Sequence, residues 1–174
     1  MDRTRRAYRA KVGFRAVNGD WPAEPAERVR LLLARVLDEL DLKGEVEVEE
    51  GEATIEAEVI GDDDYGLLIG RRGQTIDALQ LLCYQAAFRG IRERKRVTID
   101  AAGYRERRRE TLTARADRAA EQALANGRPV ELDEMSAQER RVVHEHLKER
   151  TEIETYSEGE EPHRCVVVAP LLSE

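Results

Sequence analysis

Two glycines flank a pair of arginines near the middle of the chain, in the segment Gly70-Arg71-Arg72-Gly73. Glycine lets the backbone turn tightly, and without Cβ atoms a phosphodiester can approach the peptide N–H groups. A helix that begins directly after the turn would add unpaired N–H donors and a favourable dipole for an anion. The arginines would add charge-assisted hydrogen bonds. An isolated GxxG string is also typical of a plain turn, so its context must decide between the two.

A second set of polar residues lies on a helix predicted to begin with a capping box at Ser136–Glu139. At the helical repeat, Arg140 and His144 lie one turn apart on a basic face that includes Arg141, where they could grip a phosphate together. His146 lies nearer the apolar arc, and we expect it in the core. The alternative interpretation is an ordinary solvent-exposed helix face.

Neither set has the spacing of a catalytic or metal site. His144 and His146 are two positions apart, so they point to different sides of a helix, unlike the i, i+4 pair of a zinc-binding helix. Cys83 and Cys165 lie far apart in apolar surroundings, as expected of reduced core thiols. We therefore expect no enzymatic activity, no metal ion and no cofactor.

The elements that must position the glycine turn follow the order α-β-β-α-α-β. Helical spacing of apolar residues predicts the helices, and strict alternation predicts a hairpin with an apolar inner face and a carboxylate-lined outer face. The expected elements are a helix over 26–40, strands over 45–49 and 55–59, a short helix capped by 62–64, a helix from the turn to about 88, and a strand over 94–100.

The helix after the turn carries two apolar stripes. The first, expected to pack on the sheet, consists of Ile76, Leu79, Leu82, Cys83 and Ala86. The second consists of Leu81, Tyr84 and Phe88. This second stripe is expected to pack under helix 26–40, or else to form a partner surface.

The rest of the chain predicts a second unit around the basic helix face. Its expected elements are a long helix over 104–125, a short strand over 130–132, a helix from 136 to 149, and strands over 152–156 and 164–169. The long helix has an apolar stripe at Leu112, Ala116, Ala119, Ala120 and Ala123, which continues backwards into Arg105, Arg108 and Arg109. These arginines either pack their stems on the edge of the first sheet or link two basic surfaces electrostatically.

Charge is strongly segregated along the 174 residues, although the net charge is −7. Residues 38–64 hold 13 acids and one base, whereas residues 89–118 hold 11 bases and 5 acids. Screening limits exposed charges to a reach of about 8–10 Å, so a basic surface can bind phosphates while an acidic surface faces away. Composition therefore permits nucleic-acid binding without requiring it.

The N-terminal 22 residues are basic and lack periodicity, so we expect a mostly flexible arm there and a tail at 171–174. The start of the chain lacks the apolar stretch of a signal peptide, and no apolar run has the length of a membrane span. We expect a soluble, cytoplasmic protein.

The order of elements around the glycine turn, over about residues 24–101, resembles a type II KH domain, an RNA-binding module whose GxxG loop holds about four nucleotides. The resemblance implies that the loop residues Gly70–Gly73 hold the RNA backbone and that Ile69, Ile76 and Val97 line a groove for bases. It implies binding without chemistry. A loop facing solvent would also tolerate Gly70→Asp with Gly73→Asp without loss of the fold.

The Arg140-x-x-x-His144 pair, the segment 155–164 and the valine strand after it resemble an R3H domain, over about residues 104–170. R3H modules bind single-stranded nucleic acid. The resemblance implies that the basic helix face and the start of the last strand contact phosphates, and the long helix would add two further arginines. The residues assigned to this second surface are Arg140, Arg141, His144, Arg164, Arg105 and Arg108.

A KH domain (23–102) followed directly by an R3H domain (103–170) is similar to the bacterial Jag family, also called KhpB or EloR, of SpoIIIJ-associated RNA-binding proteins. The resemblance implies an α+β protein that acts as a post-transcriptional regulator on single-stranded RNA or DNA; we expect no membrane partner, because no apolar run has the length of a membrane span. The partner it implies is a KhpA-type KH protein or a second copy, through Leu81, Tyr84 and Phe88. The 22 preceding residues are too few for the Jag-N domain of many members. The alternative is an interaction adaptor whose KH fold mainly mediates dimerisation.

Overall fold

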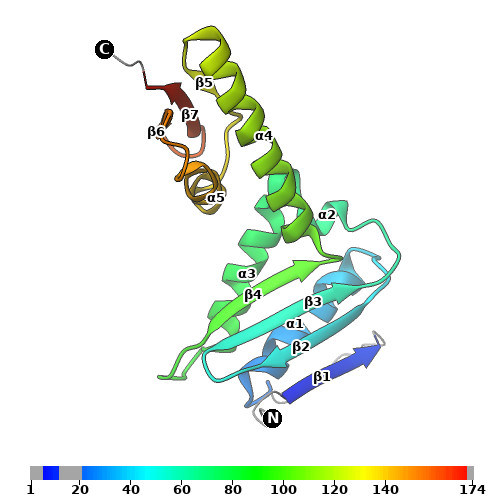
Figure 1. Cartoon of the computed structure of the whole chain (residues 1–174). Helices are drawn as coiled ribbons and strands as arrows, with labels where there is room; N and C mark the ends of the chain where they lie inside the picture. Colours follow the sequence, from blue (N-terminus) through cyan, green and yellow to red (C-terminus); the bar gives the residue numbers. More distant parts are fainter. Residues whose placement is uncertain (1–5, 12–20, 172–174) are drawn as a thin grey trace. The chain divides into compact units, whose positions relative to one another are not determined.

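The computed structural model describes residues 6–11 and 21–171 (Figure 1). The chain divides into two compact units, of which the first ends at Tyr104 and the second begins at Arg105. Each unit has its own sheet and its own hydrophobic core. The protein is therefore of the α+β class. The predicted domain limits would place the boundary between Ala102 and Gly103, in the connection that precedes the long helix.

The first unit is a four-stranded sheet with its helices on one face (Figure 1). Strand order is β1-β2-β3-β4, with β3 and β4 parallel and the other pairs antiparallel. Because parallel neighbours need a crossover connection, the chain from β3 to β4 crosses the sheet face and carries the glycine turn with it. The elements are β1 (Arg6–Lys11), α1 (Pro25–Glu39), β2 (Glu45–Glu50), β3 (Thr54–Ile60), α2 (Gly66–Ile69), the 3-10 turn η1 (Arg71–Gly73), α3 (Gln74–Ala87) and β4 (Arg96–Ala101).

The two faces of this sheet differ completely in chemistry. On the inner face, Val46 and Val48 of β2 and Ile55 of β3 are buried with residues of α1 and α3 in one core. The opposite face, here called the acidic sheet face, carries Glu45, Glu47, Glu49, Glu56 and Glu58. Its register places Glu47 opposite Glu58 and Glu49 opposite Glu56. The hairpin with an acidic outer face is thus confirmed, and its like-charged pairs oppose one another.

Strand β1 corrects the expectation of a flexible arm for residues 6–11. This segment pairs antiparallel with β2, and the register sets Arg9 opposite Glu47 and Lys11 opposite Glu45. A six-residue edge strand with three basic residues carries little periodic signal, so the sequence pattern did not reveal it. The remaining arm residues, 1–5 and 12–20, lie outside the described residues.

The second unit packs two helices with a three-stranded antiparallel sheet of order β5-β7-β6. The central strand β7 is buried from Val166 to Ala169, and the predicted alanine-rich stripe of α4 is buried against this core. Within the described part of the chain, no helix is long and apolar enough to cross a bilayer. The elements are α4 (Tyr104–Asn126), β5 (Val130–Glu131), α5 (Ala137–Leu147), β6 (Ile153–Glu158) and β7 (Cys165–Pro170).

The predicted stripes of α3 are only partly right. Ile76, Leu79 and Cys83 are buried, but Leu82 is 60% exposed. The buried stripe runs on through Ala87, which follows Cys83 by one helical turn. Of the second stripe, Phe88 is buried, Tyr84 is half-buried and Leu81 is 59% exposed. A helix that lies on a sheet buries one stripe of side chains, and neither Leu81 nor Leu82 belongs to that stripe.

Candidate nucleic-acid interface

The glycine turn joins the end of α2 to the start of α3 by a sharply bent backbone. Gly70 has φ 72° and ψ 178°, and Gly73 has φ 81° and ψ 6°. Arg72 between them is also left-handed, with φ 55° and ψ 30°. Only glycine adopts such φ values without a steric penalty, which explains the two glycines. Gly73 N closes the bend by donating to Gly70 O at 3.3 Å.

Both glycines are also required because neighbouring atoms fill the space of a side chain. A Cβ on Gly70 would overlap Thr75 Oγ1 and lie 2.9 Å from Thr75 N. A Cβ on Gly73 would lie 2.9 Å from Tyr104 Oη and 3.0 Å from Tyr104 Cε1. Gly73 is buried, with the tyrosine ring lying against it. The expectation that Gly70→Asp with Gly73→Asp leaves the fold intact is therefore wrong.

The loop arginines differ in how far they reach solvent. Arg71 is exposed, whereas Arg72 and Ile69 are half-buried. Gln74 and Thr75, the first residues of α3, are exposed as well. This end of α3 therefore presents a cation beside the positive end of the helix dipole, an arrangement that favours an anion.

Two residues predicted to line a groove for bases are core residues instead. Ile76 is 0% exposed and Val97 is 4% exposed, and both belong to the core of the first unit. Neither side chain can stack on a base without disrupting that core. Each lies on the sheet-packing side of its element, which motif position alone does not reveal. Ile69 stays in the candidate interface because it is only half-buried.

Arg140 of α5 is held inside the second unit, not presented on an open basic face. The residue is 8% exposed. Its Nη1 donates to Met135 O at 2.9 Å, and its Nη2 donates to Glu161 Oε1 at 2.6 Å. The carboxylate comes from the loop between β6 and β7. The predicted phosphate grip on Arg140 is thus occupied by a carboxylate of the same chain.

His144 is equally engaged, because both ring nitrogens face hydroxyl groups of β6. Nδ1 lies 2.8 Å from Thr155 Oγ1, and Nε2 lies 3.0 Å from Ser157 Oγ. A hydroxyl can donate or accept, so either tautomer is satisfied. Burial, and then the charge of Arg140, lower the pKa of His144 below its ordinary value of 6.5. The ring is therefore neutral at pH 7 and joins α5 to β6.

Arg164, at the start of the last strand, completes a group that we call the Ser157 cluster: Arg140, His144, Ser157 and Arg164. Arg164 Nη2 donates to Ser157 O at 3.4 Å. Its Nε is buried and has no hydrogen-bond partner among the described residues. Sequence reasoning found the three basic members but missed Ser157, whose only signal is its place two residues after Thr155 on a strand.

Two further basic residues predicted for this surface, Arg141 and Arg108, also have carboxylate partners. Arg141 is exposed and pairs with Glu145 at 2.9 Å, one turn along α5. Arg108 Nε lies 2.7 Å from Glu139 Oε1, and both side chains are more than four-fifths buried. Arg108 therefore fixes α4 to the first turn of α5, and Arg105 is half-buried. Arg141 is left as the predicted cation of this unit that is most accessible to a ligand.

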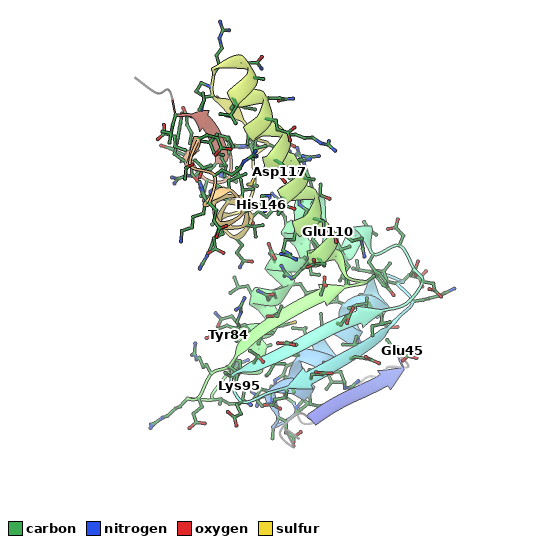
Figure 2. All side chains as sticks on the ribbon, viewed as in Figure 1. Glu45, Tyr84, Lys95, Glu110, Asp117 and His146 are labelled. Carbon is green, nitrogen blue, oxygen red and sulfur yellow. The ribbon has the colours of Figure 1, made fainter. Side chains whose placement is uncertain are left out.

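His146 and the cysteines show no chemical activation. His146 is exposed and pairs with Asp117 of α4 at 3.0 Å, so the expectation of a core histidine is wrong (Figure 2). Burial raises the pKa of Cys83 to about 12, as for an inert core thiol. Among the described residues, no three His, Cys, Asp or Glu side chains come together as a metal site.

The comparisons with known proteins agree with this geometry. A family profile described as "KhpA/KhpB, KH domain" matches residues 26–99, and one described as "R3H domain" matches residues 110–170. The chain is therefore a KH domain followed by an R3H domain, and the GxxG loop lies in the former.

Relatives from three bacteria match along most of the chain, and each is named RNA-binding protein KhpB. The Bacillus subtilis relative is 34% identical over 90% of this chain and 80% of its own length. The Clostridium symbiosum relative is 38% identical over 79% of this chain and 62% of its own length. The Lactiplantibacillus plantarum relative is 38% identical over 85% of this chain and 49% of its own length. On this similarity, together with the order of its two domains, the chain belongs to the KhpB family.

Proposed function

We propose that this chain binds single-stranded RNA without catalysis and acts as a post-transcriptional regulator in the cytoplasm. The observation that carries the proposal is the GxxG loop, with two left-handed glycines and the exposed Arg71 at the start of a helix. Backbone N–H groups and a guanidinium at one place suit a phosphodiester. KH and R3H domains are binding modules, and three relatives are named RNA-binding proteins.

The two units contribute differently to this binding. The GxxG loop is the main site, with Gly70 and Gly73 setting the backbone and Arg71 and Arg72 contacting phosphate. In the R3H domain, the accessible Arg141 supplies a phosphate contact, and Arg164 supplies another from the Ser157 cluster. Of the remaining predicted residues of this domain, Arg105, Arg108 and His144 act chiefly by positioning, and Arg140 is held by Glu161.

Titration of a labelled single-stranded RNA at several salt concentrations tests this function. We expect binding that weakens with salt, with a slope of log K against log salt of roughly −2 to −3.5 for three to five phosphate contacts. Single-stranded DNA of the same sequence should bind more weakly, because the 2′-hydroxyl is the group that distinguishes RNA. Absence of binding, or affinity indifferent to salt, would contradict the proposal.

A specific observation favours a protein partner as well. Leu81 and Leu82 of α3 are 59% and 60% exposed, and adjacent exposed leucines are typical of an interface. We place the partner surface on these two residues, because Phe88 is in the core. A KhpA-type KH protein is the proposed partner, since one KH family profile covers KhpA and KhpB.

Leu82→Glu should weaken the complex with a KhpA-type KH protein by at least about tenfold, because a buried unpaired charge is costly at an interface. Isothermal titration measures the affinity. Gln85→Glu, at an exposed position of the same helix, is the control and should leave it unchanged. Equal affinity of both variants would exclude this surface. Sedimentation of the chain alone separates this complex from self-association.

A further inference from the structure

The contact between Arg140 and Glu161 joins a buried cation to a largely exposed anion. The Arg140 side chain is 10% exposed, whereas the Glu161 side chain is 58% exposed. Arg140 Nη1 is anchored separately on Met135 O at 2.9 Å. The guanidinium therefore keeps its position if the carboxylate leaves, and the carboxylate can turn to solvent at little cost because it is already largely hydrated.

The surroundings of this ion pair contain a neutral histidine, two hydroxyl groups and a second guanidinium. His144 follows Arg140 by one helical turn, and its pKa is lowered partly by the Arg140 charge, so the two are near neighbours. Ser157 connects His144 to Arg164, whose buried Nε has no partner among the described residues. The Ser157 cluster thus contains two guanidinium groups, those of Arg140 and Arg164. Glu161 supplies the carboxylate that is hydrogen-bonded to Arg140.

We propose that Glu161 occupies the place on Arg140 that an RNA phosphate takes, so that RNA binds the R3H domain by displacing this carboxylate. This inference rests on the proposed function. A carboxylate and a phosphate both present anionic oxygens that accept hydrogen bonds from a guanidinium. The phosphate belongs to an RNA strand that is also bound to the protein at other points. The carboxylate holds Arg140 ready in the absence of RNA and lowers the net affinity of the site.

Displacement makes the affinity of this site a difference between two ion pairs. Binding forms a contact between the phosphate and Arg140 but breaks the contact between Glu161 and Arg140. The site therefore binds RNA more weakly than it would without the carboxylate. Strands anchored first at the GxxG loop have a high effective concentration and can complete the exchange. Free phosphate and short fragments lack that advantage. The carboxylate therefore discriminates against small anions.

Replacement of the carboxylate by its neutral isostere tests the inference. Glu161→Gln should tighten binding of a single-stranded RNA about three- to tenfold and leave the salt slope close to that of the wild type, because a phosphate contacts Arg140 in both complexes. The matched control is Glu160→Gln, which removes the same charge from an exposed position of the same loop. It should change affinity by less than about twofold, because exposed charges are screened.

The outcomes separate this inference from the function beneath it. Equal gains for both variants would assign the effect to general charge and overturn the inference, and weaker binding by a stably folded Glu161→Gln variant would overturn it too. In either case, the proposed RNA-binding function still stands if the wild type binds RNA and the Arg71→Glu variant does not. If Glu161→Gln lowers the melting temperature, the NMR signal of Arg140 Nε in the wild-type protein is the measurement that tests the inference. This signal should shift when RNA is added. An unchanged signal at saturating RNA would overturn the inference.

Discussion

Replacing Arg71 by glutamate should lower the affinity for single-stranded RNA about 10- to 100-fold, and adding Arg72→Asp should lower it further. Arg71 is exposed just before the start of α3, where a carboxylate would repel the phosphate instead of attracting it. The loss corresponds to about 1.4–2.8 kcal/mol. Aspartate is suitable at position 72 because it tolerates the left-handed conformation that Arg72 adopts, with φ 55°.

The control for this charge reversal is Arg35→Glu on α1. Arg35 is an exposed arginine of the same domain that forms an ion pair with Glu39, one helical turn along α1. It produces the same change in net charge and should alter affinity by less than about threefold. Fluorescence anisotropy at one fixed salt concentration measures both variants. Similar losses for Arg35→Glu and Arg71→Glu would mean that long-range charge, not the loop, governs binding.

Gly73→Ala should destabilise the KH domain by about 2–4 kcal/mol. The new Cβ would lie 2.9–3.0 Å from the Tyr104 ring, and Gly73 has φ 81°, a conformation that strains alanine. Left-handed strain costs about 1 kcal/mol, and overpacking adds about 1–3 kcal/mol. Urea unfolding of the full chain, followed by circular dichroism, gives the change in free energy.

Gly90 provides an unusually clean control for the strain component. Its φ is 78°, close to that of Gly73, but nothing lies within 4 Å of a Cβ built there. Gly90→Ala should therefore cost only about 1 kcal/mol. The difference between the two variants measures the contact with Tyr104. If both variants lose the same amount, the ring moves aside at no cost, and Tyr104 does not support the loop.

The elements of the KH domain could be predicted because their signals are local. Strict alternation from Glu45 to Val59 fixed the hairpin and its acidic face, and helical spacing fixed α1 and α3. The capping box at Ser136 is present as predicted, with Glu139 bonded back to the Ser136 N–H. The glycine loop was placed correctly because its neighbours are helices.

The details of both sites depend on partners distant in sequence, which local patterns do not contain. Tyr104 fills the space under Gly73 from 31 residues away, and Glu161 reaches Arg140 from 21 residues away. The sequence marks Arg140 as basic but does not show that a carboxylate already holds it. Ile76 and Val97 were misassigned for a different reason: motif position placed them in a base groove, although helical spacing already puts Ile76 on the stripe that packs on the sheet. Strand β1 depends on pairing with β2, again a non-local property.

The acidic sheet face has a kinetic consequence for the KH domain. Five glutamates line one side of the sheet, whereas α2, the GxxG loop and α3 form the crossover on the other side. A polyanion that diffuses toward the glutamates is repelled, so collisions at that side rarely lead to a complex. Productive encounters therefore occur mainly on the loop side. The electrostatic potential of the domain orients an approaching RNA strand before any contact forms. The acidic sheet face thus restricts the directions from which RNA can associate with the domain, but it lies away from the contacts that hold the bound RNA at the loop.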